Sequence, residues 1–427
     1  MKVVLMAGGR GTRMETFAPN LPKSMIPICG KPIIQHQLES LVQNNLKDII
    51  IIIGHLGSQI KEFVSDGSKF GCNVSYFEEI TPLGSGGALF KIFDLLDDYF
   101  ILINGDLIFD LDFSRFIDFY YEKKAWAALA VHPNSHPFDS ALLVTDNDNR
   151  ITEWLNKEEK REYYQNLVNA GIHIFSKKFL SSLNPISEKV DLDREMIKPQ
   201  IFSGNFFAYH TPEYIKDAGT PERFNQVKND LESGIVKKRN LTFKQRAVFL
   251  DRDGTINKSA GFINKPNDLE LIPGVADAIA RINKTGYLAI VITNQPVIAR
   301  GECTLEELKS IHNKMETDLG KSGAFIDDLF YCPHHPDKGF PGEIVELKIN
   351  CNCRKPRPGM IFSAAEKFNI DLSSSYMVGD QISDVNTAIA SGCIPVMLGE
   401  DTGINLNENK EILHFPSLSD FVASCLS

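Results

Sequence analysis

The sequence has 427 residues, of which 43% are hydrophobic and 23% are charged, and its formal net charge is −10. This length predicts two or three domains, and the composition is that of a folded globular protein, which excludes disorder over most of the chain. The acidic total excludes the overall basic surface that nucleic-acid-binding proteins present. No apolar run is long enough to cross a bilayer, and the opening residues are not typical of a signal peptide. We therefore expect a cytoplasmic protein with no nucleic-acid or membrane partner.

The first half of the chain alternates strand and helix patterns. Fully apolar runs predict buried strands at 3–6, 49–53 and 99–103. A stripe of Ile34, Leu38, Leu41 and Val42 predicts an amphipathic helix near residues 32–42. This alternation is typical of an α/β domain whose mainly parallel sheet is covered by helices on both faces.

A second α/β unit follows a polar, basic stretch. Residues 232–246 lack apolar periodicity and predict either a linker or the last edge of the first domain, so we place the boundary near residue 240. Strands are then predicted at 247–250, 288–292 and 376–378, and a helix begins near Gly359. The expected domains are residues 1–240 and 241–427, each with a mainly parallel sheet and flanking helices.

A glycine-rich loop leaves the first strand. In the segment LMAGGRGTR, three glycines let the backbone approach an anion, and Arg13 adds a cation suited to phosphate oxygens. Lys23 supplies a second cation ten residues further on. The loop is neither a Walker A motif nor a GxGxxG motif. By itself it is weak evidence, and a tight turn with a surface arginine is the alternative.

Four further blocks follow this loop within the first half. They are PLGSGGA at 82–88, NGD at 104–106, NAGI at 169–172 and DAGTP at 217–221. Together with the loop, the five ordered blocks resemble the sugar-1-phosphate nucleotidyltransferases over about residues 1–235. The resemblance implies a nucleotide-diphospho-sugar transferase-like fold of the Rossmann type. It also implies the reaction of a sugar 1-phosphate with a nucleoside triphosphate, in which pyrophosphate leaves.

The resemblance implies roles for residues of these blocks. Asp106 and Asp217 would hold Mg²⁺, while Arg13 would bind the leaving pyrophosphate. Lys23 would neutralise charge at the α-phosphate. Lys157 would bind the sugar phosphate, although Asn156 replaces the glutamate of the family's F-x-E-K pattern. The other implied substrate-binding residues are Gly8, Gly9, Gly11, Thr12, Gly84 and Gly171. The opening of the chain resembles the guanylyl- and thymidylyl-transferring branches about equally well.

The second half opens with Asp251 and Asp253, which stand two residues apart at a strand end in the string DRDGT. Side chains at i and i+2 leave a strand on the same side, so the pair suits phosphoryl chemistry with one nucleophile and one proton donor. A pair of capping or solvated aspartates is the alternative. Thr293 and Asn294 end the next strand, and Lys355 precedes a helix N-terminus, where an anion binds well.

These pieces, followed by Gly379-Asp380 and by Asp384, resemble the haloacid dehalogenase-like phosphatases over about residues 246–400. The resemblance implies a second Rossmann-type fold, in which Asp251 becomes an aspartyl phosphate and Asp253 serves as acid and base. Asp251, Asp253 and Asp380 would coordinate Mg²⁺, with Asp253 contributing its backbone carbonyl. The implied substrate-binding residues are Thr293, Asn294, Arg300, Arg354 and Lys355.

Three of the eight cysteines gather around a histidine. Cys332 and His334 precede Cys351 and Cys353, and three thiolates with one imidazole are typical of structural zinc. Free cysteines in a loop are the alternative, and His335 is a weaker ligand candidate. The loop resembles those of the histidinol phosphatases and of the D-glycero-D-manno-heptose 1,7-bisphosphate 7-phosphatases. The segment IARG, which ends in Arg300 and Gly301, favours the heptose branch. The chain departs from that branch at Pro296, Val297 and Gln381.

The two halves fit consecutive steps, because a heptose bisphosphatase would leave the 1-phosphate that a nucleotidyltransferase uses. The first half most resembles guanylyltransferases that act on D-glycero-α-D-manno-heptose 1-phosphate. We therefore predict a bifunctional enzyme that makes GDP-heptose for bacterial surface polysaccharide, with Mg²⁺ in both sites and structural Zn²⁺ in the second domain. The alternatives are a transferase for another sugar 1-phosphate, a phosphatase for another substrate such as histidinol phosphate, and a non-catalytic, zinc-stabilised second domain. The sequence leaves the oligomeric state open, including a homo-oligomer.

Overall fold

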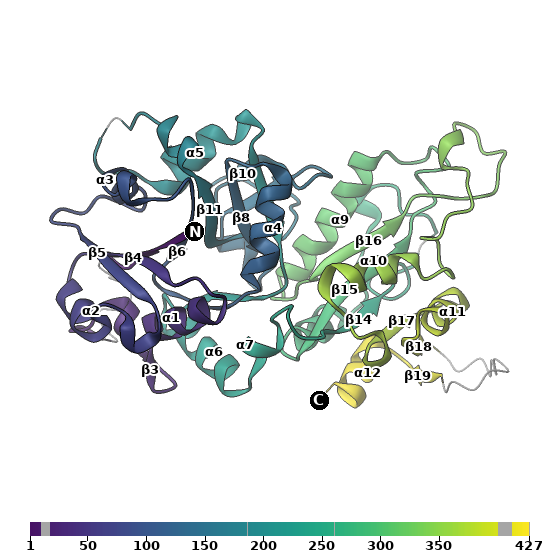
Figure 1. Ribbon diagram of the computed structural model, residues 1–427. Helices are drawn as coiled ribbons and strands as arrows, with labels where there is room; N and C mark the ends of the chain where they lie inside the picture. The colour runs from purple at the N-terminus through teal and green to yellow at the C-terminus, as the bar shows by residue number, and fades with distance from the viewer. Residues whose placement is uncertain (10–17, 186, 260, 400–411, 427) are drawn as a thin grey trace. The chain divides into compact units, whose positions relative to one another are not determined.

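A computed structural model describes residues 1–9, 18–185, 187–259, 261–399 and 412–426. The chain divides into two compact units, which Figure 1 colours along the sequence. The first unit comprises Met1–His132, Leu143–Leu155 and Asn169–Asn240, and the second comprises Pro133–Leu142, Asn156–Val168 and Leu241–Ser427. The predicted division near residue 240 differs from these units at the two short segments 133–142 and 156–168. No helix within the described ranges is both long and apolar enough to span a membrane.

The first unit is built on a mixed sheet in the order β10-β9-β11-β6-β1-β4-β5, with β8 paired to β11 and β12 paired to β8. Its strands are β1 (Lys2–Met6), β4 (Asp48–Ile53), β5 (Asn73–Glu78), β6 (Tyr99–Asn104), β8 (Ala127–His132), β9 (Leu142–Thr145), β10 (Ile151–Leu155), β11 (Val168–Ser176) and β12 (Phe206–His210). The four strands from β6 to β5 are parallel, whereas β11 runs antiparallel to β6. A separate antiparallel pair joins β7 (Leu107–Asp110) to β13 (Tyr214–Asp217).

Helices cover the sheet of the first unit because its central strands are apolar on both faces. The helices are α1 (Ile33–Gln43), α2 (Gly57–Val64), α3 (Gly87–Lys91), α4 (Phe113–Lys123), α5 (Lys177–Ser181), α6 (Pro221–Glu232) and α7 (Ile235–Lys238). In the predicted stripe of α1, Ile34, Leu38 and Leu41 are fully buried and pack in one core with Val3 and Leu5 of β1. The predicted strands and this helix are confirmed. Burying such a leucine or isoleucine contributes about 1.5–3 kcal/mol.

The polar stretch that suggested a boundary belongs partly to the first unit. It contains α7, whose Val236 is buried in a core with Ile108, Tyr214 and Ala218 from the β7–β13 pair and the turn after it. Among the two alternatives for this stretch, the structure therefore favours the last edge of the first unit over a free linker.

The second unit has a fully parallel sheet in the order β16-β15-β14-β17-β18-β19. The strands are β14 (Arg246–Leu250), β15 (Tyr287–Asn294), β16 (Asp328–Cys332), β17 (Tyr376–Gly379), β18 (Ile394–Leu398) and β19 (Leu413–Phe415). The helices are α8 (Val275–Ile282), α9 (Leu305–Gly320), α10 (Gly359–Phe368), α11 (Ile382–Ser391) and α12 (Leu418–Cys425).

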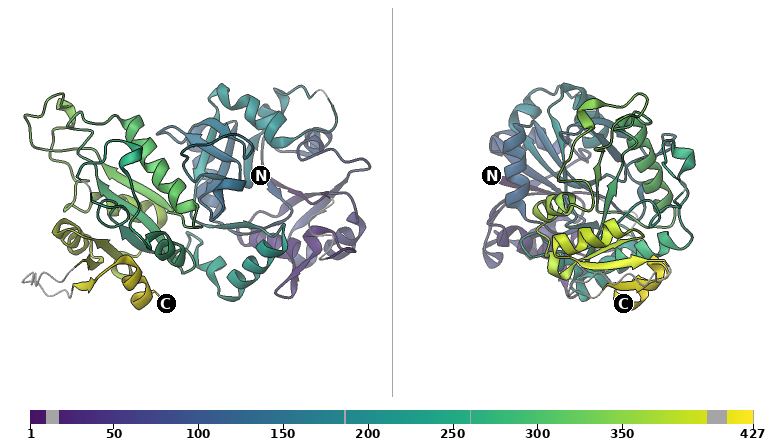
Figure 2. Two further views of the ribbon diagram at one scale, coloured as in Figure 1. Left: turned by 180° about the vertical axis from the view of Figure 1, so that it is seen from behind. Right: turned by 90° about the vertical axis from the view of Figure 1, so that its right-hand side faces the viewer.

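Strand alternation divides the second core into two layers, one on each face of the sheet. Val248 and Leu250 of β14 pack with α8, α9 and α12, whereas Ala247 and Phe249 of the same strand pack with α10 and α11. Figure 2 shows these helices from two further directions. The predicted strands at 247–250, 288–292 and 376–378 and the helix beginning at Gly359 are confirmed, and all three strands direct their carboxyl ends to one edge of the sheet.

The segment 156–168 is bound to α9 within the second unit. The backbone N–H of Tyr164 donates to Thr317 Oγ1 at 2.9 Å, and that of Asn166 donates to a carboxylate oxygen of Glu316 at 2.7 Å. Burial raises the pKa of Glu316 from an ordinary value near 4.5 to about 8, although the Asn166 hydrogen bond opposes the rise. Glu316 is therefore protonated at neutral pH in the folded unit.

Replacing Glu316 by glutamine is expected to stabilise the second unit at pH 8. Between about pH 4.5 and pH 8 the Glu316 carboxyl ionises in the unfolded chain but stays protonated in the folded unit. This ionisation stabilises the unfolded state, so the free energy of unfolding of the wild type falls over this pH range. Glutamine keeps an oxygen that accepts from Asn166 but has no charge to lose. We expect a gain of about 2–4 kcal/mol at pH 8 and little change at pH 4.5. Calorimetric unfolding at both pH values measures this. The exposed Glu306→Gln on the same helix is the control, and a glutamine variant that keeps the wild-type pH slope would contradict the assignment.

Candidate active sites

The first unit brings Asp106 and Asp217 together through the β7–β13 pair. Asp217 lies opposite Leu107, and the backbone N–H of Ala218 donates to the Asp106 carbonyl at 2.9 Å. Lys23 forms an ion pair with the Asp106 carboxylate, and Gly219 lies so close that a Cβ there would be 2.6 Å from Lys23 Nζ and 2.7 Å from Asp217 Oδ1. The predicted cation and both predicted metal ligands therefore lie around one point.

Two residues that the sequence did not single out hold this site. Arg223, in the first turn of α6, donates from Nη1 to Asp217 Oδ2 at 2.9 Å. The buried Gln37 of α1 donates from Nε2 to the carbonyls of Asn104 and Leu107, at 2.9 and 3.0 Å, and so fixes the turn that carries Asp106. The two carboxylates supply the hard oxygen ligands that Mg²⁺ requires, so the residues present fit that ion.

The glycines predicted to bind substrate lie at close backbone approaches. Gly84 has φ +79°, and a Cβ there would be 2.4 Å from the Val190 carbonyl oxygen. Gly171 has φ +76° and faces the Asn104 side chain. A Cβ at Gly8 would lie 2.5 Å from Glu79 Oε2, whereas no described residue lies within 4 Å of a Cβ at Gly9. Gly11, Thr12 and Arg13 lie outside the described residues. Lys157 is exposed and belongs to the segment 156–168 of the second unit.

The second unit gathers three aspartates around Lys355 at the carboxyl ends of its strands. Lys355 Nζ lies 2.8 Å from Asp251 Oδ1 and 2.7 Å from Asp384 Oδ1, and all three side chains are almost completely buried. Carboxylate oxygens of Asp251, Asp380 and Asp384 lie within 4.8 Å of one another. Asp384 carried no assigned role in the sequence prediction. Its signal was its spacing after Gly379-Asp380, but only the fold shows that it binds the lysine.

Burial and charge set the protonation of this cluster. Burial raises the pKa of Asp251, and the Lys355 ammonium opposes that rise. Burial alone would lower the pKa of Lys355, but Asp251 and Asp384 outweigh it and raise that pKa above its usual value. Gly254 has φ +87°, and a Cβ there would be 2.1 Å from Asp380 Oδ2, so only glycine fits beside this carboxylate. The compact carboxylate set around Asp251 and Asp380 fits the hard oxygen ligation of Mg²⁺.

Three further predicted phosphatase residues make defined contacts within the second unit. Asn294 and Lys355 form reciprocal hydrogen bonds, from Asn294 Nδ2 to the Lys355 carbonyl at 3.2 Å and from the Lys355 N–H to Asn294 Oδ1 at 3.0 Å. Thr293 is buried and accepts from Gln295 at 2.9 Å. The Arg300 guanidinium lies 4.2 and 4.4 Å from the ring centroids of Phe262 and Phe340. These contacts hold the three side chains in defined orientations, and their roles in binding substrate stay predictions.

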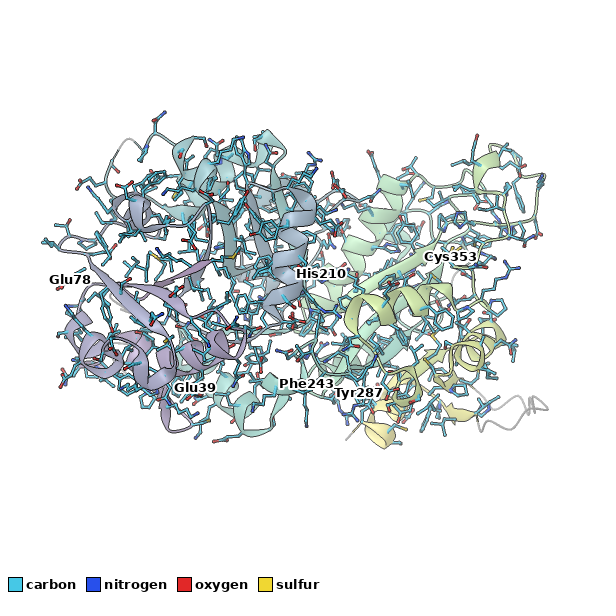
Figure 3. The ribbon with its side chains drawn as sticks, viewed as in Figure 1. Glu39, Glu78, His210, Phe243, Tyr287 and Cys353 are labelled. Carbon is cyan, nitrogen blue, oxygen red and sulfur yellow. The ribbon has the colours of Figure 1, made fainter. Side chains whose placement is uncertain are left out.

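The predicted zinc ligands form a compact cluster, in which Figure 3 labels Cys353. The three sulfur–sulfur distances among Cys332, Cys351 and Cys353 are 3.5, 3.4 and 3.2 Å, and His334 Nδ1 lies 3.3 Å from Cys353 Sγ. A disulfide would need about 2.0 Å. A zinc tetrahedron with bonds of about 2.3 Å has edges of about 3.8 Å, close to these separations. The donor set therefore fits zinc, and it excludes His335, which lies outside this cluster.

The cluster of three cysteines and His334 also adjoins Lys355. Arg354 and Lys355 directly follow Cys353, and Arg354 Nη1 donates to the His334 carbonyl at 3.2 Å. Lys355 therefore stands two residues from a member of the cluster, on a segment that Arg354 links to His334.

Replacing Cys353 by serine is expected to abolish zinc binding and to lower the unfolding midpoint of the second unit by roughly 10 °C or more, because structural zinc contributes folding free energy directly. Phosphatase activity falls with it, whereas nucleotidyl transfer is retained. Zinc content by mass spectrometry and calorimetry measure the two effects. Cys425→Ser, in α12 and outside the cluster, is the control. Full zinc content and an unchanged midpoint in the Cys353 variant would contradict the site.

Comparisons with known proteins find relatives of both units. A family model described as nucleotidyl transferase matches residues 2–234, and a model described as HAD-hydrolase-like matches residues 352–424. The D-glycero-β-D-manno-heptose-1,7-bisphosphate 7-phosphatase of Yersinia pestis is 41% identical over 151 residues, which are 35% of this chain and 78% of that protein. The corresponding phosphatase of Vibrio cholerae is 41% identical over 167 residues, 39% of this chain and 87% of that protein.

The chain is also similar to a solved structure, HddC from Yersinia pseudotuberculosis complexed with GMP-PN, at 27% identity over 54% of this chain and 99% of that one, with a TM-score of 0.47. The nucleotidyl transferase match spans more than half of the chain, and the phosphatase match spans more than two thirds of its relatives. The chain belongs to the nucleotidyl transferase family through its first unit and to the HAD-like heptose-1,7-bisphosphate 7-phosphatases through its second, which makes it a bifunctional enzyme.

Proposed function

We propose that the second unit removes the 7-phosphate of D-glycero-D-manno-heptose 1,7-bisphosphate and that the first unit transfers GMP from GTP to the resulting heptose 1-phosphate. The observation that carries this proposal is the union of the two families in one chain, because the product of one reaction is a substrate for the other. The 41% identity to heptose bisphosphatases supports the sugar.

In the phosphatase reaction, Asp251 is placed to attack phosphorus. Lys355 lies 2.8 Å from its carboxylate, and the buried Thr293 stands at the end of the neighbouring strand, so both can hold phosphoryl oxygens. Asp253 donates a proton to the leaving sugar oxygen and then takes one from the attacking water. Asp251 and Asp380 would hold Mg²⁺, which would neutralise charge at the phosphoryl group. Asp384 keeps Lys355 charged and oriented, since the two are paired in the interior.

In the transferase reaction, both reactants are anions, so positioning and charge neutralisation dominate catalysis. Lys23 stands beside Asp106 and close to Asp217, where it can meet the α-phosphate. Arg223 fixes the orientation of the Asp217 carboxylate. Asp106 and Asp217 would hold Mg²⁺, which would supply counter-charge for the triphosphate.

The choice of guanine is supported by Glu79. Its carboxylate lies beside Gly8 and accepts from the backbone of Leu83, in the loop that by resemblance contacts the nucleoside. A carboxylate accepts two hydrogen bonds side by side, which matches the N1–H and N2–H₂ donors of guanine. Thymine presents a single donor between two carbonyls. We therefore expect Glu79→Gln to reduce the preference for GTP over dTTP about tenfold or more.

A matrix of the four nucleoside triphosphates against several sugar 1-phosphates, with pyrophosphate release as readout, tests the transferase half. The proposal predicts the highest kcat/KM for GTP with heptose 1-phosphate. A panel of phosphate esters that includes histidinol phosphate tests the phosphatase half. Preference for histidinol phosphate, or no turnover of any ester, would replace the proposal with one of its alternatives.

A further inference from the structure

Arg252 stands between the two aspartates in sequence, yet its side chain is completely buried. It donates to Asp253 through two nitrogens. Nη2 lies 2.9 Å from both Asp253 Oδ1 and Oδ2, and Nε lies 3.2 Å from Oδ1. A planar guanidinium with several donors restrains both the position and the rotation of a carboxylate, which a lysine cannot do.

Two buried amides complete the contacts of Asp253. Gln295 Nε2 donates to Asp253 Oδ2 at 3.0 Å and to Thr293 Oγ1 at 2.9 Å, while Gln295 Oε1 accepts from Arg252 Nη2 at 3.1 Å. Asn257 Nδ2 donates to Asp253 Oδ1 at 3.0 Å. Each oxygen of Asp253 is thus held by the guanidinium and by one amide. The Asp253 side chain remains 29% exposed, whereas Arg252, Gln295 and Asn257 are at most 2% exposed.

Asp253 keeps an exposed edge although buried donors hold both of its oxygens. The exposed edge is where a proton can be exchanged with substrate or water. Gln295 also links Asp253 to Thr293 by hydrogen bonds, and Thr293 is placed to hold the phosphoryl group.

We propose that Arg252 and Gln295 are positioning residues that aim Asp253 at the leaving oxygen and then at the attacking water. The inference rests on the phosphomonoester hydrolysis of the second unit. In the first step an Asp251 oxygen bonds to phosphorus, the bond between phosphorus and the sugar oxygen breaks, and the Asp253 proton moves to that oxygen. In the second step water gives its proton to Asp253, its oxygen bonds to phosphorus, and the aspartyl–phosphorus bond breaks. If Arg252 only fills the core, a substitution that preserves the fold should leave the rates of both steps unchanged.

The dependence of the rate on the leaving group distinguishes a positioning role of Arg252 from a general loss of structure in the variant. A sugar alkoxide needs a proton to leave, whereas p-nitrophenolate leaves without one. In Arg252→Met, single-turnover release of the sugar should slow 10²–10³-fold, in the range that general acid catalysis contributes. Release of p-nitrophenol in the first turnover should slow by less than about tenfold. Because hydrolysis of the aspartyl phosphate also needs Asp253, p-nitrophenyl phosphate should give a burst followed by slow turnover, with aspartyl phosphate accumulating in quenched samples.

Matched variants make the test decisive. Arg252→Lys should recover part of the sugar release, and the exposed Arg281→Met on α8 should behave as wild type. Gln295→Leu should give the same leaving-group split without removing a buried charge, and it serves if Arg252→Met does not fold. Equal slowing with both substrates, or no slowing with the sugar phosphate, would overturn the inference. An error in the proposed substrate is distinguishable from an error in this inference, since the wild-type protein itself would then fail to hydrolyse the heptose bisphosphate.

Discussion

Replacing Asp251 by asparagine is expected to lower phosphatase turnover by about 10⁴-fold or more while nucleotidyl transfer continues at its wild-type rate. Asparagine keeps the size of the side chain but cannot form the aspartyl phosphate, and removing a nucleophile leaves only the contributions of binding and charge. Lys355 would also lose one of its two carboxylate partners, although Asp384 remains 2.7 Å away. Phosphate release from the bisphosphate and pyrophosphate release with heptose 1-phosphate measure the two activities.

The control for this change is Asp277→Asn, an exposed carboxylate on α8 that should affect neither activity. Equal losses of both activities in the Asp251 variant would show that the two reactions share a site. Unchanged phosphatase turnover would support a non-catalytic second unit instead.

Replacing Asp106 by asparagine should have the converse effect. The change removes one of two carboxylates that fit Mg²⁺ and frees Lys23 from its ion pair, so we expect nucleotidyl transfer to fall by about 10³-fold or more. Phosphatase turnover should not change. Pyrophosphate release at saturating Mg²⁺ measures the loss, and the exposed Asp94→Asn is the matched control. A variant that retains transfer within about tenfold of wild type would contradict the assignment of Asp106.

The parts of the fold that the sequence predicted well are those governed by local pattern. Runs such as 49–53 are apolar on both faces, and only a strand covered on both sides buries all of their side chains. The cysteine cluster was also predictable from local pattern, because three cysteines and a histidine within 22 residues are typical of a zinc site. Asp251 and Asp253 directly follow β14, so the strand pattern also predicted their place at the carboxyl end of that strand.

The parts that escaped prediction depend on contacts between distant segments. Arg252 reads as a surface charge between two aspartates, and only folding shows that its side chain is buried against Asp253 and Gln295. Arg223 follows the DAGTP block as an ordinary helix residue until the turn brings it to Asp217. The segment 156–168 has no strong pattern, and its place in the second unit depends on Glu316 and Thr317, about 150 residues away.

The most direct test of the account follows both reactions in one vessel. The whole chain is supplied with D-glycero-D-manno-heptose 1,7-bisphosphate, GTP and Mg²⁺, and phosphate, pyrophosphate and nucleotide sugar are measured over time. We predict that phosphate appears first and that GDP-heptose and pyrophosphate then form in equal amounts, with Asp251→Asn blocking all three products unless heptose 1-phosphate is added. No phosphate release and no GDP-sugar from the wild-type chain would contradict the account.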